Sequence, residues 1–534
     1  MSTTLSLTSI RLILLVSAFV TITGNVEFVN QVLTIYPFQE YYLFISSLVI
    51  WIYVFLSTIM LILCFKYTLK PLLIVLLLMS SVITYFASNF GVVTDESMLL
   101  NIIQTNAGES ADLLSVKLAL YVFLLGILPS LVVYKTTLAK STIKKELLKR
   151  AIVLVALVIV FVLIVLSFSK AYASFAREHK HLKLYINPSY AIYSVGKYLN
   201  TQLDSELEDF QTYGEGAIIS EKDHERELSI LVVGETARAD RFYLNGYERQ
   251  TNPLLALEDV LSFNNVWSCD TSTARSLPCM FSMQGRDNYD RIIAQNSSNV
   301  LDVIQGTGRV EVLWRDNNDE EGSKGVADRV AYEEYLTSEV NPVCDIECRD
   351  EGMLVNLQDY IDSNPEKDML IVLHMMGSHG PAYYKRYPSE FEIFKPACQT
   401  AQLSDCNDKE INNAYDNTIL YTDYFLAKVI GLLKDNTNEF EASMIYIGDH
   451  GESLGEGGLY LHGLPYFMAP DEQKRVPVII WMDGGDIRED VNYPELSRMT
   501  NKRLAHDNLF HLLLGIFEVN TELYQPTLGL VESH

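Results

Sequence analysis

The chain has 534 residues, 49% of them hydrophobic, and a formal net charge of −26 with a pI near 4.8. Nucleic-acid binding requires clustered lysine and arginine, so this charge balance excludes a general affinity for phosphate backbones. We therefore expect no nucleic-acid partner and interpret the acidic charge as a solvated surface.

Five long apolar stretches with few charges lie near the start of the chain, at about residues 12–26, 41–65, 71–93, 118–134 and 151–169. About 20 helical residues cross the hydrocarbon core of a bilayer, so most of these stretches are long enough to span a membrane. The first is the weakest, because Gly24 and Asn25 lie near its end, and a cleaved signal peptide is its alternative interpretation. The pattern predicts an all-α transmembrane domain of five helices over residues 1–170.

Basic residues indicate which loops stay on the cytoplasmic side. One basic loop contains Lys66 and Lys70, and a second contains Lys135, Lys140, Lys144, Lys145, Lys149 and Arg150. The intervening loops carry acidic residues instead, with no lysine or arginine between Lys70 and Lys117. With the N-terminus inside, five crossings place everything after residue 170 outside.

Residues 171–224 are mixed in character. Aromatic and basic residues such as Tyr172 and Arg177 come first, and an acidic, helix-like run follows at residues 204–209. Tyrosine, lysine and arginine are favoured at the membrane surface, so we expect an interfacial connector here, with a plain linker as the alternative.

From residue 225 the pattern changes to short β-branched runs separated by helical or loop segments. The predicted strands are residues 228–233, 310–314, 369–373, 443–447 and 476–480. Such uniformly apolar runs are typical of strands covered on both faces, which predicts an α/β domain with a mostly parallel sheet over residues 225–534.

Polar residues follow four of these strands, beginning at Glu235, Arg315, His374 and Asp449. In open α/β sheets the functional site forms outside the carboxyl ends of the strands. We therefore expect these four strand ends to converge on one site.

Six of the seven cysteines lie in the C-terminal part as close pairs: Cys269/Cys279, Cys344/Cys348 and Cys398/Cys406. Local pairs of this kind suit an oxidising compartment and predict three disulfides. Zinc binding by these thiols is the alternative, although their spacings match no common C-x2-C pattern.

The first of these pairs brackets a run of hydroxyl side chains that includes Thr271, Ser272 and Thr273. A disulfide would restrict this loop and hold one hydroxyl in position for nucleophilic attack, which generally requires a base or a metal. The alternative is a structural disulfide beside a turn rich in serine and threonine.

Asp449 and His450 are candidate metal ligands, because carboxylate oxygen and imidazole nitrogen both suit zinc. Glu235 ends another strand and supplies a third possible ligand. Zinc held by these three side chains would leave a fourth position for a threonine or serine oxygen and lower the pKa of that hydroxyl.

Four motifs in this order, behind five membrane segments, carry a family resemblance. They are Gly-Glu-Thr-Ala-Arg-Ala-Asp at 234–240, Thr-Ser-Thr-Ala at 271–274, Ser-His-Gly-Pro at 378–381 and Asp-His-Gly-Glu-Ser at 449–453. The chain resembles the phosphoethanolamine transferases of Gram-negative bacteria, which include lipid A-modifying and mobile colistin-resistance enzymes. The resemblance implies an alkaline-phosphatase-like fold for the C-terminal domain.

Carried over by motif, the resemblance implies that Thr273 is the nucleophile and that Glu235, Thr273, Asp449 and His450 hold zinc, as one ion or two. It places His379 and His462 near the phosphate as catalytic and substrate-binding residues. Thr236, Thr271 and Ser272 are the competing hydroxyls.

The resemblance also implies contacts with the phosphoethanolamine group. Asn318 and Lys324 match such residues, although the segment between them is slightly longer than in relatives. In the membrane part, Asn101, Thr105 and Glu109 match an Asn-x3-Thr-x3-Glu pattern. At four-residue spacing these three would share a helix face, where a carboxylate meets an ammonium group.

The function implied is transfer of phosphoethanolamine from phosphatidylethanolamine to a phosphate of lipid A or lipopolysaccharide, through a phosphoethanolamine-threonine intermediate. A protonated His379 or His462 would protonate the leaving alkoxide. The expected setting is the inner membrane, with a monomeric enzyme and its catalytic domain in the periplasm.

Two alternatives stay open at the level of sequence. A related transferase with another headgroup or acceptor, such as phosphoglycerol, a core sugar or another envelope glycan, uses the same metal and nucleophile. A sulfatase needs a Cys or Ser in a C/S-x-P-x-R setting, which neither Cys269 nor Cys279 provides. An inactive membrane receptor or scaffold predicts a missing ligand or nucleophile, yet all four positions are occupied.

Overall fold

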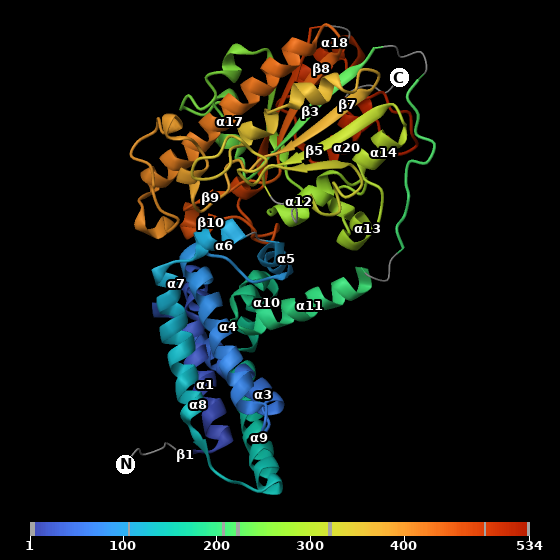
Figure 1. The fold of residues 1–534 in the computed structure, drawn as a ribbon. Coiled ribbons are helices and arrows are strands. Elements are labelled where there is room, and N and C mark those ends of the chain that lie inside the picture. Colours follow the sequence, from blue (N-terminus) through green and yellow to red (C-terminus); the bar gives the residue numbers. More distant parts are fainter. Residues whose placement is uncertain are drawn as a thin grey trace. The chain divides into compact units, whose positions relative to one another are not determined.

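The computed structural model describes residues 6–104, 107–205, 209–220, 225–318, 323–484 and 487–530 (Figure 1). The chain divides into two compact units. The first comprises Met1–Leu99 and Leu114–Tyr198, and the second comprises Leu100–Leu113 and Leu199–His534. The short segment 100–113 therefore groups with the C-terminal part, although in the sequence it separates two apolar helices.

The first unit consists of helices with a minimal β-pair, β1 (Ser6–Leu7) and β2 (Thr137–Leu138). Its helices are α1 (Ser9–Gly24), α2 (Val26–Ile35), α3 (Phe38–Leu63), α4 (Leu69–Phe90), α7 (Val116–Tyr121), α8 (Leu128–Lys135), α9 (Ile143–Ser167) and α10 (Ser169–Glu178). A π-helical turn, Val122–Ile127, joins α7 to α8. Helices α5 (Glu96–Gln104) and α11 (Ser189–Ser205) cross the boundary between the units.

Four helical spans of the described residues are long and apolar enough to cross a membrane: Phe38–Leu63, Leu69–Phe90, Val116–Lys135 and Ile143–Ser167. Helices α1 and α2 form a fifth only if the pair, bent by 52°, counts as one span. The structure thus confirms the predicted apolar helices as four or five, and the weakest predicted stretch is the broken one.

A buried pair of asparagines, Asn25 and Asn187, donates hydrogen bonds to backbone carbonyls where the first span breaks. The Asn25 side chain donates to the carbonyls of Val20 and Asn187, at 3.2 and 2.9 Å. Asn187 donates in turn to the Gly24 carbonyl at 3.0 Å and to groups on α4. A helix break in an apolar setting leaves carbonyls without intrahelical partners, so these amides replace the missing bonds.

The second unit is built on an eight-stranded sheet in the order β12-β4-β11-β8-β3-β7-β5-β6. The strands are β3 (Glu227–Gly234), β4 (Val260–Trp267), β5 (Val310–Asp316), β6 (Ala331–Glu334), β7 (Asp368–His374), β8 (Glu441–Gly448), β11 (Arg475–Met482) and β12 (Leu504–Ala505). A separate pair, β9 (Ser453–Leu454) and β10 (Tyr460–Leu461), lies outside this sheet. All five predicted strands are present.

The central strands β8, β3, β7 and β5 are parallel, whereas β11 runs antiparallel to both β8 and β4. The sheet is therefore mostly but not wholly parallel. The sequence reasoning missed β4, because its burial alternates and polar Asn264 and Asn265 interrupt its apolar run. Searching for uninterrupted apolar runs finds only strands buried on both faces.

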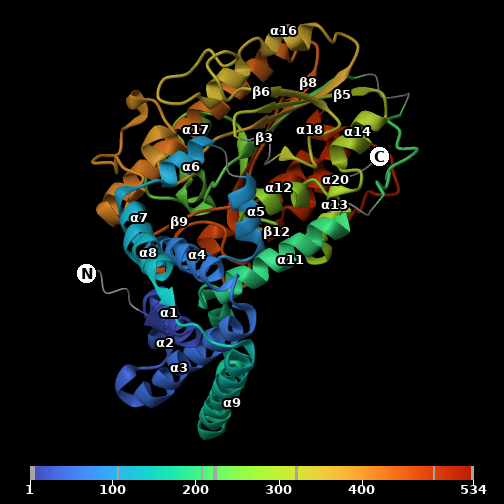
Figure 2. The ribbon, with the colours of Figure 1, turned by 60° about the horizontal axis from the view of Figure 1, so that its bottom comes forward.

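Helices cover both faces of the sheet, as Figures 1 and 2 show. Alternate residues of β3 point to opposite faces: Leu231 and Val233 join the core with α14 (Val300–Gly306) and α20 (Asp507–Ile516), whereas Ile230 and Val232 join the core with α17 (Asp408–Asn436). The remaining helices are α6 (Ala107–Leu113), α12 (Thr273–Met280), α13 (Arg291–Gln295), α16 (Leu357–Asp362), α18 (Ile487–Asp490) and α19 (Tyr493–Arg498).

Three disulfides join the predicted pairs, Cys269–Cys279, Cys344–Cys348 and Cys398–Cys406. Cys64 is free and buried in the first unit. The thiols of the second unit are therefore bonded to each other, which removes the alternative of zinc-binding cysteines.

Burial of His511 on α20 makes the stability of the second unit dependent on pH. Burial lowers the pKa of this imidazole to about 4, whereas an exposed histidine titrates near 6.5. The unfolded chain therefore binds a proton that the native state excludes, and native stability is lost as pH falls from 6.5 to 4. We expect His511→Asn, which cannot titrate, to gain on the order of 2 kcal/mol relative to the parent between pH 7 and pH 4.5. Unfolding midpoints of both proteins across this range measure the difference, and parallel curves would contradict it.

Candidate metal and nucleophile site

Three buried side chains that could bind a metal ion meet at the carboxyl ends of two adjacent strands. Glu235 follows β3, and Asp449 and His450 follow β8, its parallel neighbour. One ligand atom from each lies within 4.8 Å of the other two, and among the described residues this is the one group of three such side chains that meets this test. His450 Nε2 is 3.5 Å from Glu235 Oε1 and 3.3 Å from Asp449 Oδ2. These are two of the four strand ends that the sequence predicted to converge.

Backbone contacts orient the ligands. His450 Nδ1 lies 3.0 Å from the Gly451 carbonyl, to which it donates, so Nε2 keeps its lone pair for a metal. Asp449 Oδ1 accepts from the backbone N–H groups of Thr236 and His450 at 3.0 and 2.7 Å. Asp449 Oδ2 has no hydrogen-bond donor among the described residues. Each side chain thus directs one atom to a common point.

Thr273 completes the donor set. It is the first residue of α12, and its Oγ1 lies 3.0 Å from Glu235 Oε2 and 3.2 Å from His450 Nε2. Four donors around a tetrahedral zinc ion at 2.0–2.2 Å lie about 3.3–3.6 Å apart. The chemistry and spacing of these side chains therefore fit zinc.

The other hydroxyls are placed differently. Thr271 Oγ1 donates to the Leu464 carbonyl at 2.5 Å, and Ser276 Oγ donates to the Asp449 carbonyl at 2.6 Å. Thr236 is buried and has a φ of 50°, a left-handed conformation that is costly for a β-branched residue. Among these, Thr273 is the hydroxyl that contacts side-chain atoms of the predicted metal ligands, whereas Ser276 contacts only a ligand's backbone.

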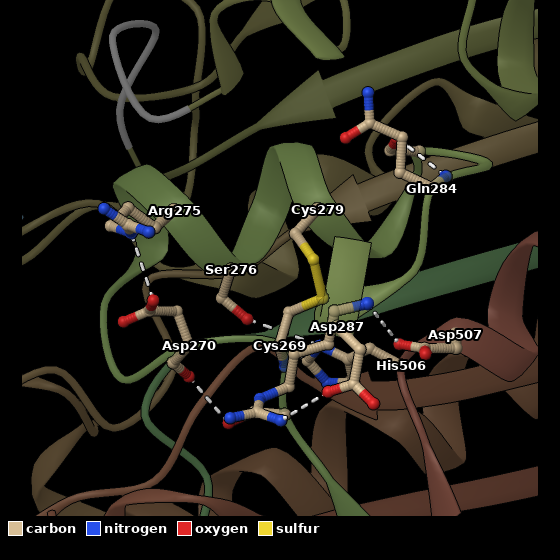
Figure 3. Close-up of a disulfide and its surroundings, with 12 residues drawn as sticks. Cys269, Asp270, Arg275, Ser276, Cys279, Gln284, Asp287, His506 and Asp507 are labelled. Carbon is tan, nitrogen blue, oxygen red and sulfur yellow. Dashed lines mark hydrogen bonds and ion pairs between the residues drawn. A yellow bond between two sulfur atoms is a disulfide. The ribbon is translucent and has the colours of Figure 1, made fainter. Parts of the chain in front are cut away.

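The Cys269–Cys279 disulfide joins the start of the hydroxyl-bearing loop to the last turn of α12 (Figure 3). Asp270, the residue after the first cysteine, pairs with Arg275 at 3.0 Å. Each of these two bonds joins a residue before Thr273 to a residue after it. They therefore restrict the loop, as the spacing of the cysteines predicted.

Two further histidines lie beside the metal ligands. The ring centroid of His462 is 4.5 Å from that of His450 and 5.3 Å from that of His379. Burial and neighbouring basic side chains hold the pKa of His379 well below its usual range, and burial lowers the pKa of His450. Both imidazoles are therefore neutral near pH 7. A neutral imidazole can bind a metal through its unprotonated nitrogen or donate a hydrogen bond to an oxyanion through its N–H.

Glu452 belongs to the Asp-His-Gly-Glu-Ser motif at 449–453 but is not among the predicted site residues. It is fully buried, and its Oε1 lies 3.4 Å from His462 Nδ1. A carboxylate at one ring nitrogen orients the imidazole and stabilises positive charge on it. The signal was present in the sequence, because Glu452 lies two residues after His450.

Asn318 contacts a metal ligand. Its Nδ2 donates to Glu235 Oε2 at 2.8 Å and to the Met375 carbonyl at 3.0 Å. Asp316 holds its backbone by accepting from the Asn318 N–H at 2.8 Å, and Asp316 also lies 3.1 Å from His374 Nδ1. Both amide hydrogens of Asn318 are thus bonded to protein oxygens, and its predicted contact with the headgroup stays a prediction.

The remaining predicted substrate contacts are less fully defined. Lys324 is exposed, Asn101 lies on α5, and Glu109 lies on α6 with its side chain outside the description. Thr105 lies outside the described residues, so the shared helix face stays a prediction.

Asp112 on α6 pairs with Lys385 and with Arg386 at 3.4 Å, and Arg386 donates to the His379 carbonyl at 2.7 Å. These bonds connect segment 100–113 to a histidine of the site.

A unit of membrane-spanning apolar helices, joined to an α/β unit with a candidate metal site beside a threonine hydroxyl, is the architecture of membrane-bound enzymes with a sulfatase-like domain. The family model described as sulfatase matches residues 228–519. The model described as phosphoethanolamine transferase EptA/EptB matches residues 52–203.

Relatives extend the match to the whole chain. The phosphatidylethanolamine transferase Mcr-2 of Escherichia coli is 42% identical over 95% of this chain and 94% of its own. The phosphoethanolamine transferase EptA of E. coli K12 is 37% identical over 99% and 97%. The solved integral membrane lipooligosaccharide phosphoethanolamine transferase A of Neisseria meningitidis matches with a TM-score of 0.94 and 32% identity over 99% of each chain. The chain therefore belongs to the phosphoethanolamine transferase family.

Gly377 lies against the backbone of Glu235 and sets its position. Its φ is +53°, and a Cβ there would lie 2.8 Å from the Glu235 carbonyl oxygen and 2.9 Å from its nitrogen. We expect Gly377→Ala to displace Glu235 and weaken zinc binding at least about tenfold, measured by competition with a chelator. Gly246→Ala is the matched control, because Gly246 has a φ of +93° with open space around it. Equal zinc affinity in the two variants would contradict the prediction.

Proposed function

We propose that this protein moves phosphoethanolamine from phosphatidylethanolamine to a phosphate group of lipid A. The observation that carries the proposal is Thr273 Oγ1 lying 3.0 and 3.2 Å from two predicted metal ligands, Glu235 and His450. The family supports the substrates, because relatives at 37–42% identity are named phosphatidylethanolamine or phosphoethanolamine transferases.

Glu235, Asp449, His450 and Thr273 are the residues that would hold zinc, and His379 and His462 are the side chains that would bind a second ion. Zinc lowers the pKa of a bound hydroxyl and stabilises negative charge on phosphoryl oxygens. A homologous periplasmic domain, 20% identical to this chain, has been solved with zinc. For this chain, zinc binding rests on the donor set described above.

The reaction follows from the position of Thr273. The Thr273 hydroxyl, whose pKa bound zinc would lower, loses its proton to solvent before the attack. The Thr273 oxygen then forms a bond to the phosphorus of the phosphodiester, and the bond from phosphorus to the diacylglycerol oxygen breaks. The released oxygen takes a proton from a histidine, and phosphoethanolamine stays on Thr273. An oxygen of the lipid A phosphate then attacks the same phosphorus and frees Thr273.

Of the two histidines, we favour His462 as the proton donor. Glu452 Oε1 lies 3.4 Å from His462 Nδ1 and stabilises positive charge on that ring. His379 is buried and lies near the positively charged Arg386, and both features disfavour protonation of its imidazole. His379 then contributes a hydrogen bond to a phosphoryl oxygen.

We assign the first unit to the inner membrane of a Gram-negative cell and the catalytic domain to the periplasm. The distribution of lysine and arginine in the loops supports this orientation, and three disulfides support an oxidising compartment. Because both substrates are lipids, a membrane anchor raises their effective concentration at the site.

The direct test is intact-mass analysis of lipid A from a host that lacks its own transferases and expresses either this protein or a variant. We expect a phosphoethanolamine-sized gain in mass with the parent. Thr273→Ala should lower transfer on the order of 1,000-fold because it removes the nucleophile. Thr271→Ser is the matched control, because it changes a neighbouring hydroxyl that binds the Leu464 carbonyl.

Each contrary result points to one part of the proposal. A gain from both the parent and Thr273→Ala would exclude Thr273 as the nucleophile. If neither protein modifies lipid A although both are present in the membrane, the acceptor is another envelope glycan or the headgroup differs, and mass analysis of the remaining glycolipids distinguishes these outcomes.

A further inference from the structure

His506 is a fully buried histidine whose side chain lies beside Cys269 and Ser276 (Figure 3) and contacts Gly448 at the end of β8. It directly precedes α20 and follows the short strand β12, which pairs with β4. Its backbone N–H donates to the Trp267 carbonyl at 3.0 Å. The backbone of His506 is therefore fixed to β4 independently of its side-chain contacts.

Both nitrogens of the ring are engaged. The backbone N–H of Cys269 donates to His506 Nδ1 at 3.1 Å, and His506 Nε2 lies 2.9 Å from the Gly448 carbonyl oxygen. Because Nδ1 accepts, the ring proton lies on Nε2 and is donated to Gly448. The imidazole thus bridges two backbone groups with opposite hydrogen-bonding roles.

The two groups belong to the two halves of the site. Cys269 begins the loop that leads to Thr273, and Gly448 is the last residue of β8, directly before Asp449 and His450. The Cys269–Cys279 disulfide also joins Cys269 to the last turn of α12, the helix that Thr273 begins. Any displacement of Cys269 is therefore transmitted to both ends of the nucleophile segment.

A second bond runs parallel to this bridge. Ser276 on α12 donates to the Asp449 carbonyl at 2.6 Å, and its Oγ lies 3.3 Å from His506 Nδ1. His506 and Ser276 together link the helix of the nucleophile to the strand end that carries two ligands. The disulfide alone gives no such link, because both of its cysteines lie on the nucleophile side.

We propose that His506 is a positioning residue that sets the placement of Thr273 relative to Asp449 and His450 by bridging the Cys269 N–H and the Gly448 carbonyl. The inference concerns geometry within the site and rests on the proposed function for its activity readout. Its physical basis is that a misplacement of about 1 Å at reacting atoms costs on the order of 100-fold in rate. Partners of metal ligands typically contribute 10- to 100-fold to metal affinity or activity.

His511 separates positioning from ordinary burial. It lies on α20, is buried like His506, and accepts from the Gln525 N–H at 3.2 Å. Its hydrogen bond and ring contacts are to Gln525, Phe510 and Tyr524, none of which belongs to the candidate site. Replacing either histidine disturbs a buried hydrogen bond near the same helix, but only His506 bridges the two halves of the site.

The test compares His506→Gln and His506→Asn with His511→Gln and His511→Asn, each in the full-length protein purified in detergent. A glutamine nitrogen can reach toward the position of Nε2 and an asparagine oxygen toward that of Nδ1, so each variant keeps one side of the bridge. Three quantities are measured: zinc affinity by chelator competition, thermal unfolding midpoint, and kcat and KM with a short-chain phosphatidylethanolamine.

We expect both His506 variants to lower kcat by 10- to 100-fold with KM within about twofold, and to weaken zinc binding about tenfold. The His511 variants should shift the unfolding midpoint by a similar amount while leaving kcat and zinc affinity unchanged. Ser276→Ala should lower kcat in the same way, and combining it with His506→Gln should cost less than the product of the two effects, because both act on one linkage.

Equal losses of stability in the His506 and His511 variants, with unchanged kcat and zinc affinity, would falsify the proposal. If the His506 variants fail to fold, Ser276→Ala decides the question alone, since unchanged kcat and zinc affinity there exclude a positioning link. Failure of the proposed function has another signature: the parent itself turns over no phosphatidylethanolamine, while zinc affinity still compares His506 with His511.

Discussion

The buried pair of carboxylates at the ends of β3 and β8 is the constraint on which the rest of the site depends. Glu235 and Asp449 lie away from water, and a buried carboxylate without a counter-charge costs several kcal/mol. Backbone N–H groups satisfy Asp449 Oδ1, and Asn318 satisfies Glu235 Oε2, while the ligand atoms Glu235 Oε1 and Asp449 Oδ2 lie within 3.5 Å of His450 Nε2. A divalent cation is the counter-charge that this arrangement fits, and the parallel pairing of β3 with β8 brings the ligands together.

Thr273, the proposed nucleophile, reaches these side chains from another part of the fold. Thr273 begins a short helix, and three devices with different physics hold it: a covalent Cys269–Cys279 bond, the ion pair of Asp270 with Arg275, and hydrogen bonds through His506 and Ser276. The first two act within the loop, whereas the hydrogen bonds cross to β8. A disulfide restricts a segment, but the register between two segments requires bonds that join them.

In the first unit, too, side-chain hydrogen bonds join segments that are far apart in the sequence. Where the first apolar helix breaks at Gly24 and Asn25, Asn187 supplies the hydrogen bonds that water cannot supply in a bilayer. Segment 100–113 lies between two apolar helices in the sequence, yet it groups with the second unit and connects through Asp112 and Arg386 to the backbone of His379. The predicted headgroup residues Asn101 and Glu109 lie on this segment, which is consistent with a substrate that is itself a lipid.

The sequence by itself determined the apolar helices, the buried strands, the cysteine pairs and the motif residues of the site, because each of these signals is local. Strand runs of five or six apolar residues and polar residues directly after them can be read without knowing what they contact. Only the tertiary structure decided which hydroxyl meets the metal ligands, since Thr271 and Thr273 are two residues apart but bond to different partners. It also decided the antiparallel direction of β11, the interrupted strand β4 and the contacts of Glu452 and His506. These depend on pairing between segments as much as 237 residues apart, as for His506 and Cys269, and no local pattern records such pairing.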